Sequence, residues 1–313
     1  MTPATIAGIP IGDGHPCQVV AEIGTNAAGS LRVAKEMIKT AKDAGCAFVK
    51  FQARTPELAV PKAEWNELRD TPWGTMTKLD YRKRVEFSEE EYLKLFAHAK
   101  QIGIVAFASV WDLPSLERME RTGSPCHKIP SARLHDFTLI EATTATKKPI
   151  ILSTGMSTGQ DVRNAVNQAW MGWGYKYGLP SGIRDPDWKT DTPGLTILQC
   201  TSAYPAKAEE SNLRVIRLYR WEFGCPVGFS SHKIGIQTCV LAVAVGANLI
   251  ERHITFSRNA HGSDHRMSST KEDLARLVKE IRYTEACLGD GTKKVEASEE
   301  TEARRLRGSS CTT

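Results

Sequence analysis

Two histidines of this chain stand in short apolar runs, GFSSHKIGI (228–236) and IERHITF (250–256). Such a run is typical of a buried strand, and a histidine in it is often a core residue. However, His232 and His253 at neighbouring strand ends, with Glu251 beside the second, are also the donor types that a divalent transition metal binds. Two imidazole ligands leave coordination positions open, which Lewis-acid catalysis requires. The remaining polar residues decide between these interpretations.

A second set of polar residues suits a compact anion that carries phosphate. Lysines supply positive charge, and hydroxyls and loop amides donate hydrogen bonds. A helix that starts after STGMST (153–158) would add the positive end of its dipole, although an ordinary strand–turn–helix cap is the alternative for this motif. The polar residues at predicted strand ends are Glu22, Lys50, Gln52, Ser109, Lys128, Ser131, Ser153, Gln199, Ser230, His232, Glu251 and His253.

These residues follow short β-branched runs that alternate with amphipathic runs. Strands are predicted at 17–23, 47–52, 104–109, 126–129, 149–154, 195–200, 226–230 and 248–254. Helices are predicted at 30–45, 88–103, 112–121, 136–147, 158–170, 211–221, 234–246 and 271–288. Such alternation requires parallel strands joined by helices. It predicts an α/β fold of the (β/α)8 TIM-barrel class. A doubly wound open sheet is the alternative, but EIGTNAAGS lacks the Gly-x-Gly-x-x-Gly loop common there.

Side chains two positions apart in a strand share a face, and the C-terminal ends of barrel strands form the active-site mouth. Lys50 and Gln52 therefore point the same way, as do Glu251 and His253. A single lysine, histidine or glutamate is more often structural. Their convergence at the same end of nearly every predicted strand favours a functional site.

We expect one barrel domain over residues 1–305 and a flexible tail at 306–313. Two insertions lengthen the repeat. The first, 54–87, follows a strand and is expected on the catalytic face of the barrel. The second, 171–194, follows a helix and is expected on the opposite face, in a structural or interface role.

Composition limits the class of protein. The chain has 313 residues, a formal net charge of +5 and 41% hydrophobic residues, as in a globular protein with a sizeable core. The sequence contains no basic block with interleaved aromatic residues, so nucleic-acid binding is not predicted. It also contains no apolar run long enough to predict a membrane span. The N-terminus does not resemble a secretory signal. The eight cysteines are scattered without a Cys-x-x-Cys pair, which suggests reduced thiols in the cytoplasm.

As a set, the motifs resemble the sialic acid synthase, or N-acetylneuraminate synthase, family over about residues 17–300. The motifs, in chain order, are AEIGTNAAGS, VKFQ, HKIPS, LSTGMST, LQCTSAYP, GFSSHKIGI and IERHITFSRNAHGSDHRMS. The resemblance implies a TIM barrel that condenses phosphoenolpyruvate with an N-acyl hexosamine or related aldose. The products would be a 2-keto-3-deoxy acid and phosphate.

The same resemblance implies roles for individual residues. His232 and His253 would bind a divalent metal, usually Mn²⁺, with Mg²⁺ or Co²⁺ as alternatives. The residues implied to bind phosphoenolpyruvate are Lys50, Ser109, Lys128, Ser131, Ser153 and Ser230. Those implied to face the sugar or the reacting centre are Gln52, Tyr204 and Asp264. The catalytic residues would be Glu22, Lys50 and Glu251, with Glu22 acting on the water that adds to phosphoenolpyruvate and Glu251 supporting the metal site.

The chain also departs from the family pattern. It has Asn26-Ala27-Ala28-Gly29 where Asn-His-Asn-Gly is common, Ser231 where Asp is common, and Ser202 where Asn is common. We expect it to lack the antifreeze-like domain that commonly follows the barrel, and the resemblance suggests a homodimer. The sequence therefore predicts the reaction type and leaves the sugar open. The alternatives are a metal-dependent TIM-barrel hydrolase and a non-catalytic family member.

Overall fold

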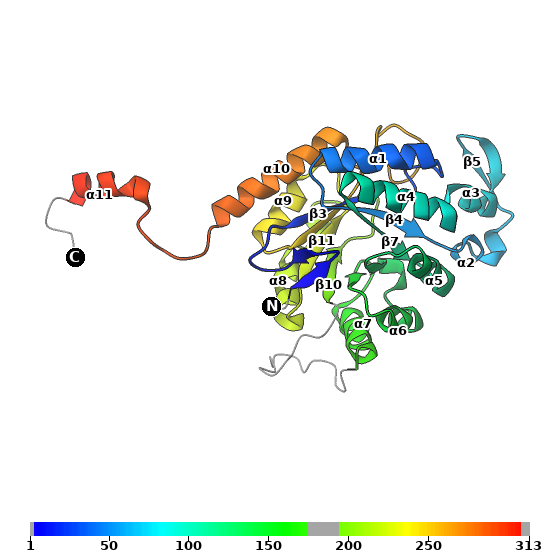
Figure 1. The fold of residues 1–313 in the computed structure, drawn as a ribbon, viewed down its shortest axis with the longest axis horizontal. Coiled ribbons are helices and arrows are strands. Elements are labelled where there is room, and N and C mark those ends of the chain that lie inside the picture. Colours follow the sequence, from blue (N-terminus) through cyan, green and yellow to red (C-terminus); the bar gives the residue numbers. More distant parts are fainter. Residues whose placement is uncertain (1–2, 175–193, 308–313) are drawn as a thin grey trace.

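The structure is a computed structural model and describes residues 3–174 and 194–307. Parallel strands form a closed barrel in the order β10-β11-β12-β3-β4-β7-β8-β9 (Figure 1). Their bounds are β3 (Gln18–Glu22), β4 (Phe48–Ala53), β7 (Val105–Val110), β8 (His127–Ile129), β9 (Ile150–Ser153), β10 (Leu195–Cys200), β11 (Val227–Ser231) and β12 (Leu249–His253). The predicted TIM barrel is confirmed, and each predicted strand is present.

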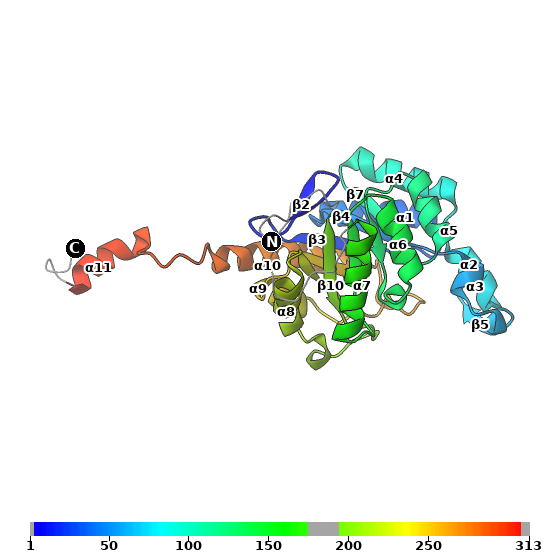
Figure 2. The same ribbon diagram turned by 90° about the horizontal axis from the view of Figure 1, so that it is seen from below.

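Helices surround the barrel on the outside (Figures 1 and 2). They are α1 (Leu31–Asp43), α4 (Glu89–Ile102), α5 (Leu113–Arg121), α6 (Phe137–Ala145), α7 (Gly159–Gly172), α8 (Arg214–Phe223), α9 (Gln237–Ala244) and α10 (Lys271–Leu288). Their ends follow from the sequence. Ser30 caps α1, and Ser88 and Glu91 form a capping box at the start of α4. Gly103 ends α4 in the left-handed conformation.

The core has two layers. Strand side chains such as Val49 and Phe51 pack outward against the helices, whereas Phe48 and Phe107 point into the barrel. A short N-terminal hairpin, β1 (Ala4–Ile6) and β2 (Ile9–Ile11), packs Ile6 and Ile11 against this inner layer. The hairpin was not predicted from the sequence. It fills the N-terminal end of the barrel, opposite the strand ends that carry the candidate site.

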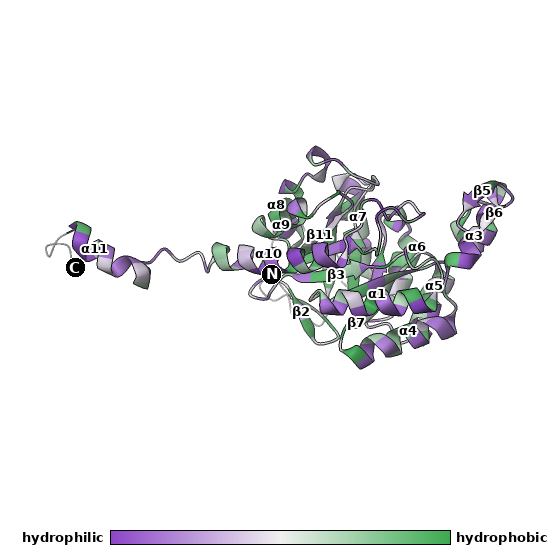
Figure 3. Ribbon diagram, turned by 90° about the horizontal axis from the view of Figure 1, so that it is seen from above, coloured by the Kyte–Doolittle hydropathy of each residue, from purple (hydrophilic) through white to green (hydrophobic). Residues whose placement is uncertain are grey.

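The insertion at 54–87 is folded rather than irregular. It contains α2 (Pro56–Ala59), the 3-10 helix η1 (Lys62–Glu64), the antiparallel pair β5 (Leu68–Thr71) and β6 (Gly74–Thr77), and α3 (Lys78–Val85). Figure 3 shows α3, β5 and β6 projecting from one side of the barrel. Of the predicted insertion at 171–194, α7 takes the first residues, and 175–193 lie outside the described residues.

Short 3-10 turns and one helix complete the described chain. They are η2 (Ser131–Arg133), η3 (Glu209–Ser211), η4 (Ala297–Glu299) and α11 (Glu300–Arg307). The last barrel helix, α10, ends at Leu288, earlier than the expected domain end at 305. The segment from 289 to 307 leads away from the barrel (Figure 1). The remainder of the expected tail, 308–313, lies outside the described residues.

Within the described ranges, no helix combines the length and the apolar character needed to cross a membrane. The cysteines described there form no disulfide, and all except Cys287 are buried.

Candidate active site

A cavity of about 240 Å³ lies at the C-terminal ends of the barrel strands. The predicted site residues that line it are Lys50, Gln52, Ser109, Lys128, Ser131, Ser153, Tyr204, Ser230, His232, Glu251 and His253. Glu22 and Asp264 lie just behind this lining, in contact with Lys50 and His253 respectively. Gln199 does not join the site, because its amide donates to the carbonyl of Ser211.

The wall of the cavity contains a buried cluster of two lysines and two glutamates. Lys128 Nζ lies 2.6 Å from Glu251 Oε1, and Lys50 Nζ lies 3.6 Å from the same oxygen. Lys50 also pairs with Glu22. Buried charges are costly unless they are paired and hydrogen-bonded. The cluster meets this requirement because its two positive charges are matched by two negative charges. The two ammonium groups lie where an anionic substrate would enter the cavity.

The two carboxylates differ in their electrostatic environment. Burial alone would raise the pKa of Glu251, but the ammonium groups of Lys128 and Lys50 hold that pKa well below its usual range. Burial raises the pKa of Glu22, against the opposing charge of Lys50. Glu251 is therefore a fixed anion, while Glu22 takes up a proton more readily. When the pKa values of two neighbouring carboxylates are shifted in opposite directions, one can act as an acid or base while the other stays charged.

Serine hydroxyls complete the anion-binding wall. Ser109 Oγ accepts a hydrogen bond of 2.9 Å from Lys50, and Ser230 Oγ donates one of 3.0 Å to Glu251. Ser131 Oγ accepts from the backbone N–H of Gly155. The buried hydroxyl of Ser153 has no hydrogen-bond partner within the described residues. The hydroxyl of Ser153, which lines the cavity, is therefore free to bond a group that enters the cavity.

The turn after β9 brings three strand ends close together. A Cβ at Gly155 would lie 2.3 Å from Ser202 Oγ and 3.0 Å from Ser131 Oγ, so a larger residue here would displace these hydroxyls. The helix start that was expected to face the anion is capped by its own side chains. Thr158 and Asp161 form a capping box at the N-terminus of α7, and neither residue lines the cavity. The contribution of this helix dipole to an anion site stays a prediction.

The two histidines lie side by side, with ring centroids 5.5 Å apart. His232 Nδ1 is 2.8 Å from the carbonyl oxygen of Thr201, so this nitrogen carries a proton. Burial alone would lower the pKa of His232, but its contacts with Cys200 and with this carbonyl raise that pKa above its usual value. Burial lowers the pKa of His253 to about 3, which keeps its imidazole neutral. Neutral imidazoles are the form that binds metal.

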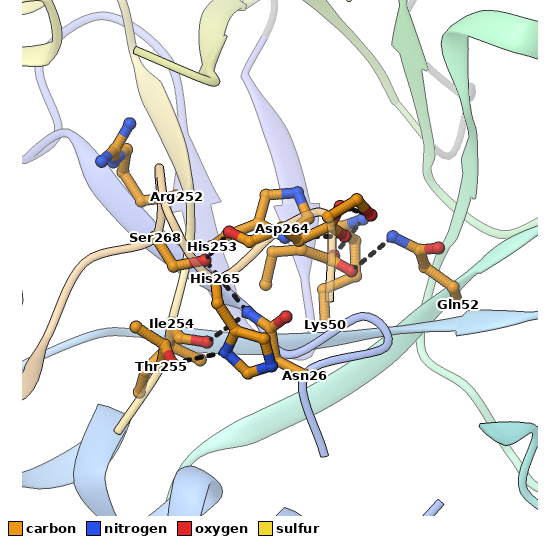
Figure 4. Close-up of polar contacts among 12 residues, drawn as sticks. Asn26, Lys50, Gln52, Arg252, His253, Ile254, Thr255, Asp264, His265 and Ser268 are labelled. Atoms are coloured by element: carbon orange, nitrogen blue, oxygen red, sulfur yellow. Dashed lines mark hydrogen bonds and ion pairs between the residues drawn. The ribbon is translucent and has the colours of Figure 1, made fainter. Parts of the chain in front are cut away.

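Asp264 approaches His253 from the loop after β12, with Oδ2 3.6 Å from Nδ1 (Figure 4). No group of three or more His, Cys, Asp or Glu side chains with metal-binding geometry occurs in the described part of the chain. The two imidazoles are the donor type that a divalent transition metal binds, and metal binding by His232 and His253 stays a prediction.

Two further residues belong to the site and were not predicted. The Arg54 guanidinium lies 3.7 Å from the ring centroid of Trp111, which lines the cavity. Arg54 donates to Gln52 Oε1, and Gln52 Nε2 donates in turn to Glu22 Oε1 at 2.9 Å. The alternation rule could have found both, because Arg54 is two positions beyond Gln52 and Trp111 is two beyond Ser109.

Comparisons with known proteins identify the family. The NeuB family matches residues 37–293. The N-acetylneuraminate-9-phosphate synthase of Mus musculus is 36% identical, over 91% of this chain and 75% of that protein. The N,N'-diacetyllegionaminic acid synthase of Legionella pneumophila is 34% identical, over 91% of this chain and 77% of that protein.

A solved structure extends this likeness to the fold. The crystal structure of the N-acetylneuraminic acid (sialic acid) synthetase of Leptospira borgpetersenii serovar Hardjo-bovis, in complex with citrate, matches with a TM-score of 0.84 and 29% identity. The match covers 99% of this chain and 98% of that chain. The chain therefore belongs to the NeuB family.

Proposed function

We propose that this synthase condenses phosphoenolpyruvate with an N-acyl hexosamine or a related aldose, and releases a 2-keto-3-deoxy acid and inorganic phosphate. The observation that carries the proposal is the pair of buried lysines in the same cavity as two histidines and the Ser153 hydroxyl, which has no hydrogen-bond partner among the described residues. The similar synthases named above make two different sugar acids. For this reason, the proposal names the class of sugar and not one sugar.

Phosphoenolpyruvate would bind at the wall formed by the ends of β4, β7, β8, β9 and β11. The residues assigned to hold it are Lys50, Ser109, Lys128, Ser131, Ser153 and Ser230. Its negative charges would take over part of the pairing that Glu251 provides to the lysines in the free protein. We therefore assign Glu251 to hold Lys128 and Lys50 in place, because its contacts are with these lysines and with Ser230.

The chemistry would join C3 of phosphoenolpyruvate to the aldehyde carbon of the sugar, while the aldehyde oxygen takes up a proton. Water adds at C2, and the C2–O bond to phosphate then breaks, so that phosphate leaves and the 2-keto group forms. Glu22 is the candidate that accepts the proton of this water. Its contacts with Lys50 and Gln52 keep it oriented for that step, and its raised pKa makes its carboxylate a stronger base.

His232 and His253 would hold a divalent cation, Mn²⁺ foremost, with Mg²⁺ or Co²⁺ as alternatives. When bound, this cation would supply Lewis-acid polarisation of the sugar aldehyde.

The sugar would be contacted by Gln52, Tyr204 and Asp264. Tyr204 is half exposed and its ring centroid lies 4.2 Å from that of His232, so it stands at the outer side of the site. A homodimer, a cytoplasmic location and a single barrel domain stay predictions.

The test is release of phosphate from phosphoenolpyruvate with Mn²⁺, across a panel of aldoses that includes N-acetylmannosamine. We expect release with one sugar class, loss of release with EDTA, and at least a hundredfold loss in His232→Ala, because one of the two imidazole ligands is removed. His98→Ala, on the outer helix α4, is the matched control and should keep full activity.

Other outcomes separate the alternatives. Phosphate release without any sugar would favour a metal-dependent hydrolase. If calorimetry detects no binding of phosphoenolpyruvate and no sugar supports release, the proposed function is wrong.

A further inference from the structure

Arg252 is the largest side chain that is almost completely buried, with an exposed fraction of 1%. It lies on β12 between Glu251 and His253, and it points away from the cavity side of that strand. No carboxylate forms an ion pair with it among the described residues. Its contacts are backbone carbonyls and serine hydroxyls from two separate segments. A buried cation of this kind requires an explanation, because its desolvation is costly.

The first segment is the turn after β11. Arg252 Nη1 donates to the carbonyl oxygens of Ser231 and Lys233, at 3.0 and 2.6 Å. These residues flank His232 on either side. The guanidinium therefore holds the backbone both before and after the histidine, whose ring is held separately by Thr201.

The second segment is the return of the loop that follows β12, residues 255–268, which carries Asp264. Arg252 Nη2 donates to the carbonyl oxygen of Met267 at 2.9 Å, and Nε donates to Ser269 Oγ at 3.2 Å. The backbone N–H of Ser269 also donates to His253 O, which closes the base of the loop.

Asn26 holds the same loop from the other side (Figure 4). Its buried amide donates to the carbonyl oxygen of Ile254 at 2.8 Å and to Ser268 Oγ at 3.0 Å. Ser268 Oγ donates onward to the carbonyl oxygen of Asp264 at 2.5 Å. The position of Asp264 beside His253 thus depends on hydrogen bonds at the base of the loop, from Asn26 on one side and Arg252 on the other.

We propose that Arg252 is a positioning residue that sets His232 and the Asp264 loop relative to His253. This inference rests on the proposed function, since it concerns the assigned metal and sugar residues. Only the planar fork of an arginine offers donors in the directions of both segments. Lysine presents its donors from a single point, so it can serve one segment and must leave carbonyls of the other unpaired.

The experiment compares Arg252→Lys with the wild-type chain in three measurements: Mn²⁺ affinity, phosphoenolpyruvate affinity and amide hydrogen exchange. We expect Mn²⁺ affinity to fall by about tenfold or more, as for other residues that orient metal ligands. Phosphoenolpyruvate affinity should change by less than about twofold, because most of its assigned residues lie on distant strands. Amides at 231–233 and 255–268 should both exchange faster.

Arg220→Lys is the matched control. Arg220 also donates to a backbone carbonyl, that of Gly246, but it lies at the opposite end of the barrel. Its replacement should lower the melting temperature without changing Mn²⁺ affinity. Ser269→Ala, which removes the hydroxyl that accepts from Arg252 Nε, serves if Arg252→Lys does not fold, and it should speed exchange at 255–268 alone.

Two outcomes overturn the inference. One is an Arg252→Lys chain that is less stable but keeps wild-type Mn²⁺ affinity and wild-type exchange in both segments. The other, where only Ser269→Ala can be studied, is unchanged exchange at 255–268. If the wild-type chain itself binds no Mn²⁺, the metal part of the proposed function fails instead, and hydrogen exchange alone decides the role of Arg252.

Discussion

At the scale of single residues, the Ser153 hydroxyl gives the sharpest test of the phosphoenolpyruvate site. It is buried and has no hydrogen-bond partner among the described residues, so its removal should not destabilise the free protein. We expect Ser153→Ala to keep or slightly raise the melting temperature. Because a hydrogen bond to a charged ligand contributes about 1.5–3 kcal/mol, the dissociation constant for phosphoenolpyruvate should rise by roughly tenfold or more.

Thr196→Val is the control for this prediction. The Thr196 hydroxyl is also buried and without a partner among the described residues, but it lies at the start of β10, away from the cavity. Loss of the Thr196 hydroxyl should change the melting temperature in the same direction as Ser153→Ala does. It should leave the dissociation constant for phosphoenolpyruvate unchanged. If Ser153→Ala binds phosphoenolpyruvate as tightly as the wild-type chain, Ser153 does not contact the ligand.

The alternation of side chains along a strand explains which site residues could be predicted. It places Lys50 with Gln52, and Glu251 with His253, at the same mouth of the barrel. The same rule covers Arg54 and Trp111, although neither was predicted. The pairing of Lys128 with Glu251 could not be predicted, because 123 positions separate them and only closure of the barrel brings them together.

At the scale of elements, the link between β3 and α1 contains a strained residue. Ala28 is exposed and has a φ of 50°, in the left-handed region that costs an ordinary L-residue about 1–2 kcal/mol. Asparagine adopts this conformation more readily. We expect Ala28→Asn to raise the free energy of unfolding by about 0.5–1 kcal/mol, measured by urea denaturation.

The exposed Ala97 in the middle of α4 is the matched position. Ala97→Asn should lower the free energy of unfolding by about 0.5–0.7 kcal/mol, since asparagine is a poorer helix former than alanine. Equal effects of the two substitutions would mean that backbone strain at Ala28 is not the cause.

The elements that could be predicted are those with their own local signals. The β-branched runs and the capping serines placed the barrel strands and helices closely. The β1–β2 hairpin carries no such signal, because each of its strands has three residues and Ile6 and Ile11 find apolar partners only once the barrel exists. The β5–β6 pair lies within a polar insertion whose strand side chains are mostly solvent-accessible, so no alternation marked it.

At the scale of the whole molecule, the repeat of strand and helix was sufficient to predict the fold class. The placement of the additions was not predictable, because each depends on the finished barrel surface. Figure 3 shows the projecting α3, β5 and β6 at one end of the molecule and α11 at the other. Both lie outside the cylinder of helices that encloses the candidate site.

The hairpin that fills the N-terminal end of the barrel has a kinetic consequence. Substrates must enter and products must leave by the same mouth. The lysines and Ser153 lie deep, whereas Tyr204 is half exposed at the rim, so the sugar would sit above phosphoenolpyruvate and block its exit. Binding should therefore be ordered, with phosphoenolpyruvate first.

Steady-state inhibition measures this order. A reduced, unreactive sugar alcohol should inhibit uncompetitively against phosphoenolpyruvate, because it can bind only after that substrate. Noncompetitive inhibition would instead show that either substrate enters first. The filled interior of the barrel and the hairpin beneath it would in this way set the order of binding at the mouth.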